Sequence, residues 1–110
     1  MTQLFMYTRE RTCGDQQLAR LCLQEFGVPY TEINISREPD AALELQELIG
    51  CLAVPTLVIA DEQRHPTTPP TPIEPYQSVR NVDRGSVISE PSRESLRQFL
   101  VKHALLQSTT

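Results

Sequence analysis

Short apolar runs alternate with amphipathic stretches over the first sixty residues. Residues 3–8 predict a buried strand, residues 30–35 a second strand, and residues 55–60 carry the strongest strand pattern in the chain. Apolar residues at helical spacing predict one helix from Gly14 to about Phe26 and another over 39–49. The expected apolar faces are Leu18, Leu21, Cys22 and Phe26 in the first helix, and Ala42, Leu45, Leu48 and Ile49 in the second.

The pattern changes at residue 61. Prolines at positions 66, 69, 70, 72 and 75 predict an irregular loop with polyproline character over residues 61–84, hereafter the Pro-rich segment. Residues 85–89 predict a short last strand. Glu90-Pro91-Ser92 predicts the start of a helix that continues to about Leu106, with Leu96, Phe99, Leu100 and His103 at helical spacing.

The predicted order is β-α-β-α-β-β-α. The first β-α-β unit implies a parallel strand pair with a right-handed crossover. The last two strands pair antiparallel only if the Pro-rich segment brings them together. We therefore expect an α/β sandwich with a small mixed sheet. Residues 1–110 are expected to form a single domain, with the Pro-rich loop as an insertion at about 61–84.

Composition and charge exclude several classes of function. The net charge is −4 and no basic cluster stands out, so nucleic-acid binding is not expected. No apolar run approaches the ~20 residues of a membrane span, and no secretory signal is visible, so a cytoplasmic location is expected. Three cysteines without Cys-x-x-Cys spacing argue against a disulfide framework and a structural metal site.

Cys13 is the candidate reactive residue. It follows a predicted strand and immediately precedes a predicted helix, where unpaired N–H groups stabilise an anion. Helix starts and nearby cations increase the thiolate fraction of a cysteine. Arg9 and Arg11 lie close in sequence and are expected to add positive potential, whereas Asp15 opposes the thiolate unless it turns to solvent or pairs with an arginine.

The other two thiols have different expected roles. Cys22 shares the apolar face of the first helix and is expected to be a core thiol. It lies nine residues after Cys13, about 13 Å along the helix, which separates the two sulfurs. Cys51 is either a loop thiol without a special role or a second, resolving thiol near Cys13. His65 and His103 have no neighbours at metal-ligand spacing.

Several short motifs occur in a specific order over residues 3–60. Together they resemble the glutaredoxin family of the thioredoxin superfamily, and residues 85–106 fit its last strand and helix more loosely. The motifs are Tyr7-Thr8, Thr12-Cys13-Gly14-Asp15-Gln16, Ala19-Arg20, Gly27-Val28-Pro29-Tyr30, Ile33-Asn34-Ile35 and Ala53-Val54-Pro55-Thr56.

This resemblance implies a thioredoxin-like fold with a four-stranded mixed sheet and about three helices. It implies that Cys13 is the catalytic nucleophile and that the Val54–Pro55 bond is cis. It also implies that the Val54 backbone pairs with an extended thiol peptide such as glutathione. The residues expected to bind substrate around Cys13 are Tyr7, Arg9, Arg11, Gln16, Val54 and Pro55.

The chain departs from the family pattern at three places. Gln16 occupies the position of the second cysteine, which closes the dithiol route there. Tyr7 lies six residues before Cys13, one more than is usual. The Gly-Gly-x-Asp segment that binds one end of glutathione is absent, and Val87-Ile88-Ser89-Glu90 stands roughly in its place.

These features leave two classes of function open. The first is a one-cysteine thiol–disulfide oxidoreductase that acts on protein or low-molecular-weight disulfides, with glutathione as co-substrate and no permanently bound cofactor. The second is a non-enzymatic binding module. One form of it would hold an iron–sulfur cluster together with glutathione, because Cys13-Gly14 resembles the start of a Cys-Gly-Phe-Ser motif. Another form would dock a partner protein through residues 61–84. An arsenate-reductase-like protein is a weaker alternative.

Overall fold

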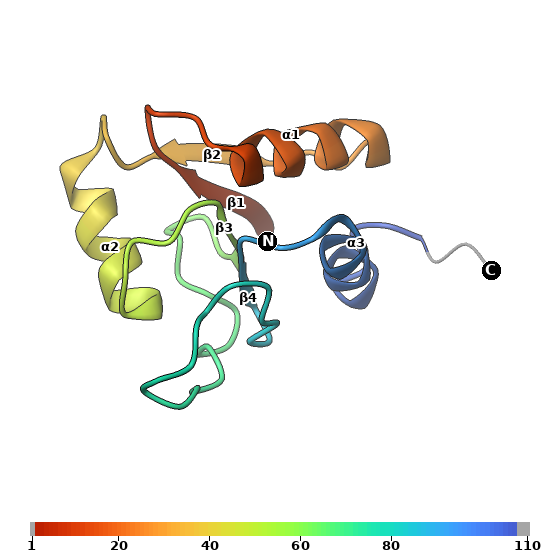
Figure 1. Cartoon of the computed structure of the whole chain (residues 1–110). Coiled ribbons are helices and arrows are strands. Elements are labelled where there is room, and N and C mark those ends of the chain that lie inside the picture. The colour runs from red at the N-terminus through yellow and green to blue at the C-terminus, as the bar shows by residue number, and fades with distance from the viewer. Residues whose placement is uncertain (1, 108–110) are drawn as a thin grey trace.

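The computed structural model describes residues 2–107, which place a four-stranded sheet between two helical layers (Figure 1). The observed order is the predicted one. The elements are β1 (Gln3–Thr8), α1 (Gly14–Phe26), β2 (Thr31–Asn34), α2 (Pro39–Ile49), β3 (Thr56–Ala60), β4 (Val87–Ser89) and α3 (Arg93–Lys102).

The sheet is mixed, with strand order β2-β1-β3-β4. β1 pairs parallel with β2, and it pairs antiparallel with β3 on its other edge. β3 and β4 also pair antiparallel, so the Pro-rich segment does bring the last two strands together. This arrangement confirms the expected thioredoxin-like α/β fold. β3 begins at Thr56 rather than Pro55, which has no N–H to donate to a strand partner, and β4 begins at Val87 rather than residue 85.

Local signals fix the helix ends. Gly27 and Gly50 follow α1 and α2 in the left-handed conformation, with φ of 69° and 83°, which glycine adopts without steric cost. At the start of α3, the Ser92 side chain accepts a 3.1 Å hydrogen bond from the Ser95 N–H. α3 ends at Lys102, earlier than predicted, because His103 leaves the helix and its Nε2 donates to the Gly85 carbonyl at 2.7 Å.

Each face of the sheet has its own apolar core. α1 and α3 cover one face, and α2 covers the other (Figure 1). Alternate residues of β1 point to opposite faces, as the two-residue period of a strand requires. Larger members of the α1–α3 core are Leu4, Met6, Leu23, Leu57 and Phe99, and those of the α2 core are Phe5, Tyr7, Ile33, Leu45 and Val58.

The apolar faces predicted for α1 and α2 were partly wrong. In α1, Ala19, Cys22 and Leu23 are buried, whereas Leu18 and Leu21 are 38% and 61% exposed. In α2, Ala41 is buried with Leu45 and Ile49, and Ala42 is only half-buried. In both helices an alanine belongs to the buried face, while leucines on the flanks remain at the surface.

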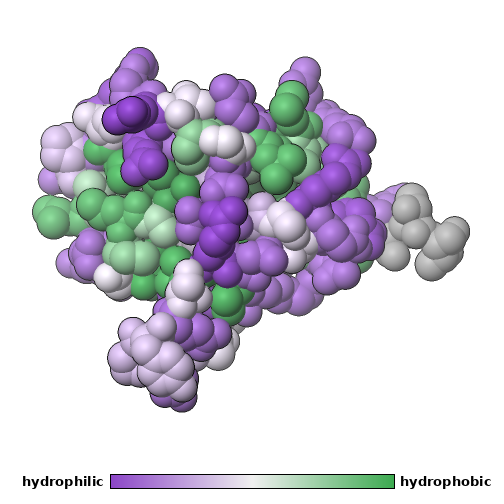
Figure 2. Space-filling model, viewed as in Figure 1, coloured by the Kyte–Doolittle hydropathy of each residue, from purple (hydrophilic) through white to green (hydrophobic). Residues whose placement is uncertain are grey.

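Hydrophobic side chains gather on the side of the molecule where α2 lies (Figure 2). Leu43 of α2 and Leu52 just after it are both exposed. The projecting part of the Pro-rich segment, at the bottom of the view, is hydrophilic (Figure 2). Among residues 2–107, no helix has the length and apolar character needed to cross a membrane.

The Pro-rich segment has no helix or extended strand, as predicted, but it is fastened to the sheet. The Thr67 N–H donates to the Ile59 carbonyl at 3.0 Å, and the Thr71 N–H donates to the Arg84 carbonyl at 2.9 Å. The buried Ser86 hydroxyl donates to the Thr68 carbonyl at 2.7 Å. These bonds hold the first half of the segment against the ends of β3 and β4.

Candidate active site

Cys13 is the N-cap residue of α1. Its backbone is extended, with φ of −119° and ψ of 168°, and its carbonyl accepts the first helical hydrogen bond from the Gln17 N–H at 3.1 Å. The thiol is free and half-buried, and its side chain makes no capping hydrogen bond. The first N–H groups of a helix lack intrahelical acceptors, so the sulfur lies at the positive end of the α1 dipole.

Gln16, at the position of the family's second cysteine, is fully buried. Its Oε1 accepts a 3.0 Å hydrogen bond from the Arg9 N–H, and its Nε2 donates to the Arg9 carbonyl at 3.3 Å. The amide thereby ties the first turn of α1 to the turn that follows β1. This arrangement makes Gln16 a positioning residue for the Cys13 turn, and none of its side chain is exposed for substrate contact.

An arginine from the Pro-rich segment reaches the first turn of α1. Arg80 Nη1 and Nη2 lie 2.6 and 3.1 Å from the two carboxylate oxygens of Asp15. Arg80 Nη1 is also 3.3 Å from the Glu90 carboxylate. The hydrogen bonds and charge of Asp15 raise the pKa of Arg80, with smaller contributions from Glu90 and the Cys13 thiolate. Asp15 is therefore paired with an arginine, which is a condition under which we expect it not to oppose a thiolate at Cys13.

A second arginine lies on the same helix. Arg20 makes a bidentate ion pair with Glu32 of β2, with both N···O distances at 2.9 Å, and Thr8 donates to the same carboxylate at 3.1 Å. Hydrogen bonds from Arg20 hold the pKa of Glu32 below its ordinary value. The pKa of Arg20 is raised, chiefly by Glu32, with a smaller contribution from the Cys13 thiolate. Two guanidinium groups, each paired with a carboxylate, thus lie on α1 or against its first turn.

The Val54–Pro55 peptide bond is cis, and both residues are buried. The Pro55 carbonyl accepts a 2.7 Å hydrogen bond from the Glu90 N–H. Within residues 2–107, no hydrogen bond uses the backbone N–H or carbonyl of Val54. The backbone polar groups of Val54 thus have no partner within this part of the protein. Because Glu90 also contacts Arg80, a chain of contacts runs from Pro55 through Glu90 and Arg80 to Asp15.

A cavity of about 220 Å³ lies beside this chain of contacts. Asp15 and the partly exposed Leu18 of α1 form one wall, and the other wall comes from two segments that are distant in sequence. These contribute Arg80 and Asn81, and Glu90, Pro91 and Ser92. Both walls thus carry charged and apolar side chains, and Asp15 in the first wall lies two residues after Cys13.

Not every residue expected to bind substrate lies in this region. The Tyr7 side chain is buried in the α2 layer, on the face of the sheet opposite α1, and its hydroxyl donates to Glu44 at 2.6 Å. Arg9 and Arg11 are exposed, and their side chains make no hydrogen bond or ion pair within residues 2–107.

The two remaining thiols occupy different environments. Cys22 is 1% exposed in the α1–α3 core, which confirms that it is a packed core thiol. Its sulfur lies 3.9 Å from Arg93 Nη1. Cys51 is half-buried and packs against the α2 core. Among residues 2–107, no three histidine, cysteine or acidic side chains are grouped to hold a metal ion.

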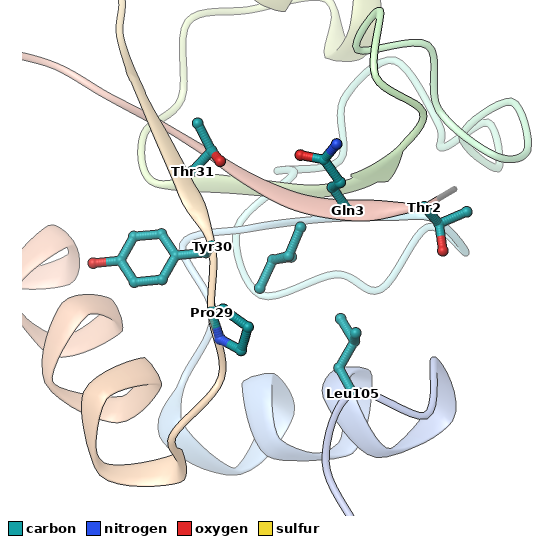
Figure 3. A pocket seen from close by; sticks show the side chains of 7 residues that line it. Thr2, Gln3, Pro29, Tyr30, Thr31 and Leu105 are labelled. Carbon is teal, nitrogen blue, oxygen red and sulfur yellow. The ribbon is translucent and has the colours of Figure 1, made fainter.

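A second cavity, of about 240 Å³, lies at the opposite end of β1. Pro29 and Leu105 face each other across it (Figure 3). Tyr30 also lines it, and burial raises the pKa of that phenol. No thiol lines either cavity, but the cavity beside Arg80 includes Asp15 of the first turn of α1, two residues after Cys13, and is therefore the better candidate site.

Sequence reasoning missed three charged residues near Cys13. Arg20 lies seven residues after Cys13, two helical turns along α1, and this spacing was a usable signal. Arg80 and Glu90 gave no comparable signal, because 65 residues separate Arg80 from Asp15 in the chain. Only the folding of the Pro-rich segment along β4 brings Arg80 to α1.

Comparison with known proteins agrees with this geometry. No curated protein and no solved structure gave a significant match. The sequence model of the glutaredoxin family matches residues 4–64, which run from β1 past β3 and include Cys13 and Pro55. The match supports a thiol redox function at the level of the family. Because it spans more than half of the 110 residues, this chain belongs to the glutaredoxin family.

Proposed function

We propose that this protein is a thiol–disulfide oxidoreductase that uses one cysteine, Cys13. The proposal rests on which residues occupy the two cysteine positions of the family motif, 13 and 16, and on how buried they are. Cys13 is a free, half-buried thiol at the start of α1, whereas the second position of the family motif holds a buried glutamine that binds backbone. A dithiol cycle between these two positions would need a second sulfur at position 16, and Gln16 does not provide one.

The proposed reaction has two exchange steps. The Cys13 thiolate attacks the glutathione sulfur of a mixed disulfide, and the bond to the substrate sulfur breaks. The substrate leaves as a thiolate and takes a proton from water, and Cys13 is left as a mixed disulfide with glutathione. A second glutathione thiolate then attacks that disulfide, restores the Cys13 thiolate and leaves as oxidised glutathione. Overall, one disulfide is exchanged for another: the substrate sulfur becomes a thiol, one free glutathione thiol is consumed, and that glutathione leaves joined to the one that came from the substrate.

The surroundings of Cys13 support this chemistry. The sulfur lies at the start of α1, a position that stabilises an anion, and a thiolate is both nucleophile and leaving group in disulfide exchange. The free backbone groups of Val54 are suited to pair with an extended peptide, as in strand addition. In this proposal Pro55 fixes the direction of that backbone, and glutathione serves as co-substrate rather than a resident cofactor.

The test is turnover of a glutathione mixed disulfide of a short peptide, with reduced glutathione as the second substrate. Cys13→Ser is expected to abolish release of the peptide thiol, whereas Cys51→Ser keeps it. A Cys51→Ser variant that also loses turnover would show that a second thiol resolves the intermediate. Failure of the folded parent protein to release any thiol would contradict the oxidoreductase and favour a binding module.

A further inference from the structure

The Pro-rich segment contributes a charge to the site that the sequence motif does not contain. Arg80 lies near the end of this segment, and its backbone forms an isolated bridge with Ser89 of β4. The neighbouring Asn81 N–H donates to the Ser89 carbonyl at 2.7 Å, and the Asn81 side chain accepts from the Ser92 N–H at 2.8 Å. Arg80 is therefore held on a fixed backbone between β4 and α3.

Asp15 is the group that this arginine acts on. A carboxylate in the first turn of a helix interacts favourably with the helix dipole, but it also repels an anion two residues away. The bidentate contact with Arg80 is the geometry in which a guanidinium binds a carboxylate most strongly. The pair offsets the negative charge of Asp15 beside Cys13, and with Glu90 on the same guanidinium the three side chains carry one net negative charge instead of two.

Other charged side chains lie around the start of α1 and also contribute to the potential there. From α1, Arg20 is paired with Glu32 of β2, and Glu90 lies on the connection between β4 and α3. The turn before Cys13 carries further charges at its surface, namely Arg9, Glu10 and Arg11, with Glu10 bound to Arg37. Of these contacts, the Arg80–Asp15 pair is the one that links the Pro-rich segment directly to the first turn of α1.

We propose that Arg80 is a positioning residue for Cys13: by neutralising Asp15, the Pro-rich segment keeps the start of α1 electropositive and sustains the Cys13 thiolate. Arg80 acts through Asp15 and needs no contact with the reacting sulfur. This inference rests on the proposed function, since it concerns the thiol that the proposed reaction uses. It adds a role for the long segment that distinguishes this chain from the family pattern.

The experiment measures the rate of Cys13 alkylation by neutral iodoacetamide as a function of pH. The parent protein is the full chain with Cys22→Ala and Cys51→Ser, so that Cys13 is the only thiol. Arg80→Met is expected to move the midpoint of the pH–rate profile upward by about half a unit, the size expected for an exposed ion pair. Asp15→Asn is expected to move it downward, and the double variant is expected to lie close to the parent.

Two further variants separate electrostatics from folding. Arg80→Lys retains the cation and is expected to keep the midpoint nearer to the parent than Arg80→Met does. Arg97→Met removes a surface ion pair with Glu94 on α3 and is expected to leave the midpoint unchanged. The shift caused by Arg80→Met is also expected to shrink in about 1 M salt, where the Debye length is short.

The inference is overturned if Arg80→Met and Asp15→Asn both keep the parent midpoint, or if Arg80→Lys shifts it as far as Arg80→Met. Alkylation does not require turnover, so the two proposals fail separately. Shifted midpoints without release of a peptide thiol would contradict the proposed reaction alone. Turnover with unshifted midpoints would contradict the role of Arg80 alone.

Discussion

The buried Gln16 amide holds the Arg9 backbone at both of its polar atoms, through bonds of 3.0 and 3.3 Å. This relationship fixes the turn that carries Cys13, because Arg9 follows β1 directly and Gln16 lies in the first turn of α1. The residue that removes the second thiol from the motif thus has a structural role of its own.

Gln16→Leu is therefore expected to destabilise the protein. Leucine has a similar volume but leaves the Arg9 N–H and carbonyl without their partners, which costs about 1–3 kcal/mol. The free energy of unfolding is measured by denaturant titration. Gln17→Leu is the matched control, because Gln17 is exposed and its side chain makes no hydrogen bond within residues 2–107. Equal stability of the two variants would show that the amide does not hold the turn.

The order of helices and strands could be predicted because each element has a local pattern. Gly27 and Gly50 mark helix ends through their own conformation, and the β3 sequence is apolar after Thr56. The site could be predicted only in part. Cys13 and Pro55 belong to local motifs, but the Arg80–Asp15 pair depends on the path of the Pro-rich segment, which no periodicity describes.

Burial of individual side chains was predicted less well than the elements that carry them. Leu18 and Leu21 are of a residue type common in protein cores, yet Ala19 and Leu23 occupy the buried face of α1. Tyr7 lies in a motif next to the redox turn, but strand alternation directs its side chain to the α2 layer. A pattern of residue types does not determine which side of an element approaches its neighbour.

Native-state labelling distinguishes the three thiols. Iodoacetamide at neutral pH is expected to modify Cys13 and Cys51, which are half-buried, but not Cys22, which is 1% exposed. Reaction at Cys22 requires opening of the core and is expected to be about a thousandfold slower or more. Peptide mass mapping gives the three rates, and unfolded protein labelled at all three sites is the control. Equal rates at Cys22 and Cys51 would contradict the packing of α1.

Alkaline pH is expected to destabilise the protein through Tyr7. Burial, followed by the hydrogen bond to Glu44, raises the pKa of Tyr7 well above its ordinary value of 10.0. Since the unfolded chain loses this proton near pH 10 and the folded protein retains it, stability is present below pH 10 and falls as the pH rises further. The expected loss from Tyr7 is about 1 kcal/mol between pH 10 and pH 11.

Denaturant titrations of the parent and of Tyr7→Phe at both pH values check this expectation. The phenylalanine variant should lose less stability over the interval, because it has no proton to release. Tyr30→Phe is measured in parallel, since burial also raises the pKa of Tyr30. Parallel pH dependences for the parent and Tyr7→Phe would show that the Tyr7 phenol is not protected in the folded protein.

Limited proteolysis tests how the Pro-rich segment is attached. Its first half is fastened at Thr67, Thr68 and Thr71, and its end is held at Arg80, so the intervening residues are the least constrained. Tyr76 is 88% exposed within that stretch. Dilute chymotrypsin is expected to cleave first after Tyr76, because proteases act on exposed chain that opens locally. The fragments are identified by mass spectrometry.

Tyr76→Ser is the control, and it should remove this first cleavage without changing the thermal stability of the protein. Arg80 lies on the anchored side of the cleaved bond, held by β4 and by Asp15. The nicked protein is therefore expected to keep the alkylation profile of intact Cys13. A profile that moves toward that of Arg80→Met after nicking would mean that the whole Pro-rich segment, rather than its last few residues, holds Arg80 against α1.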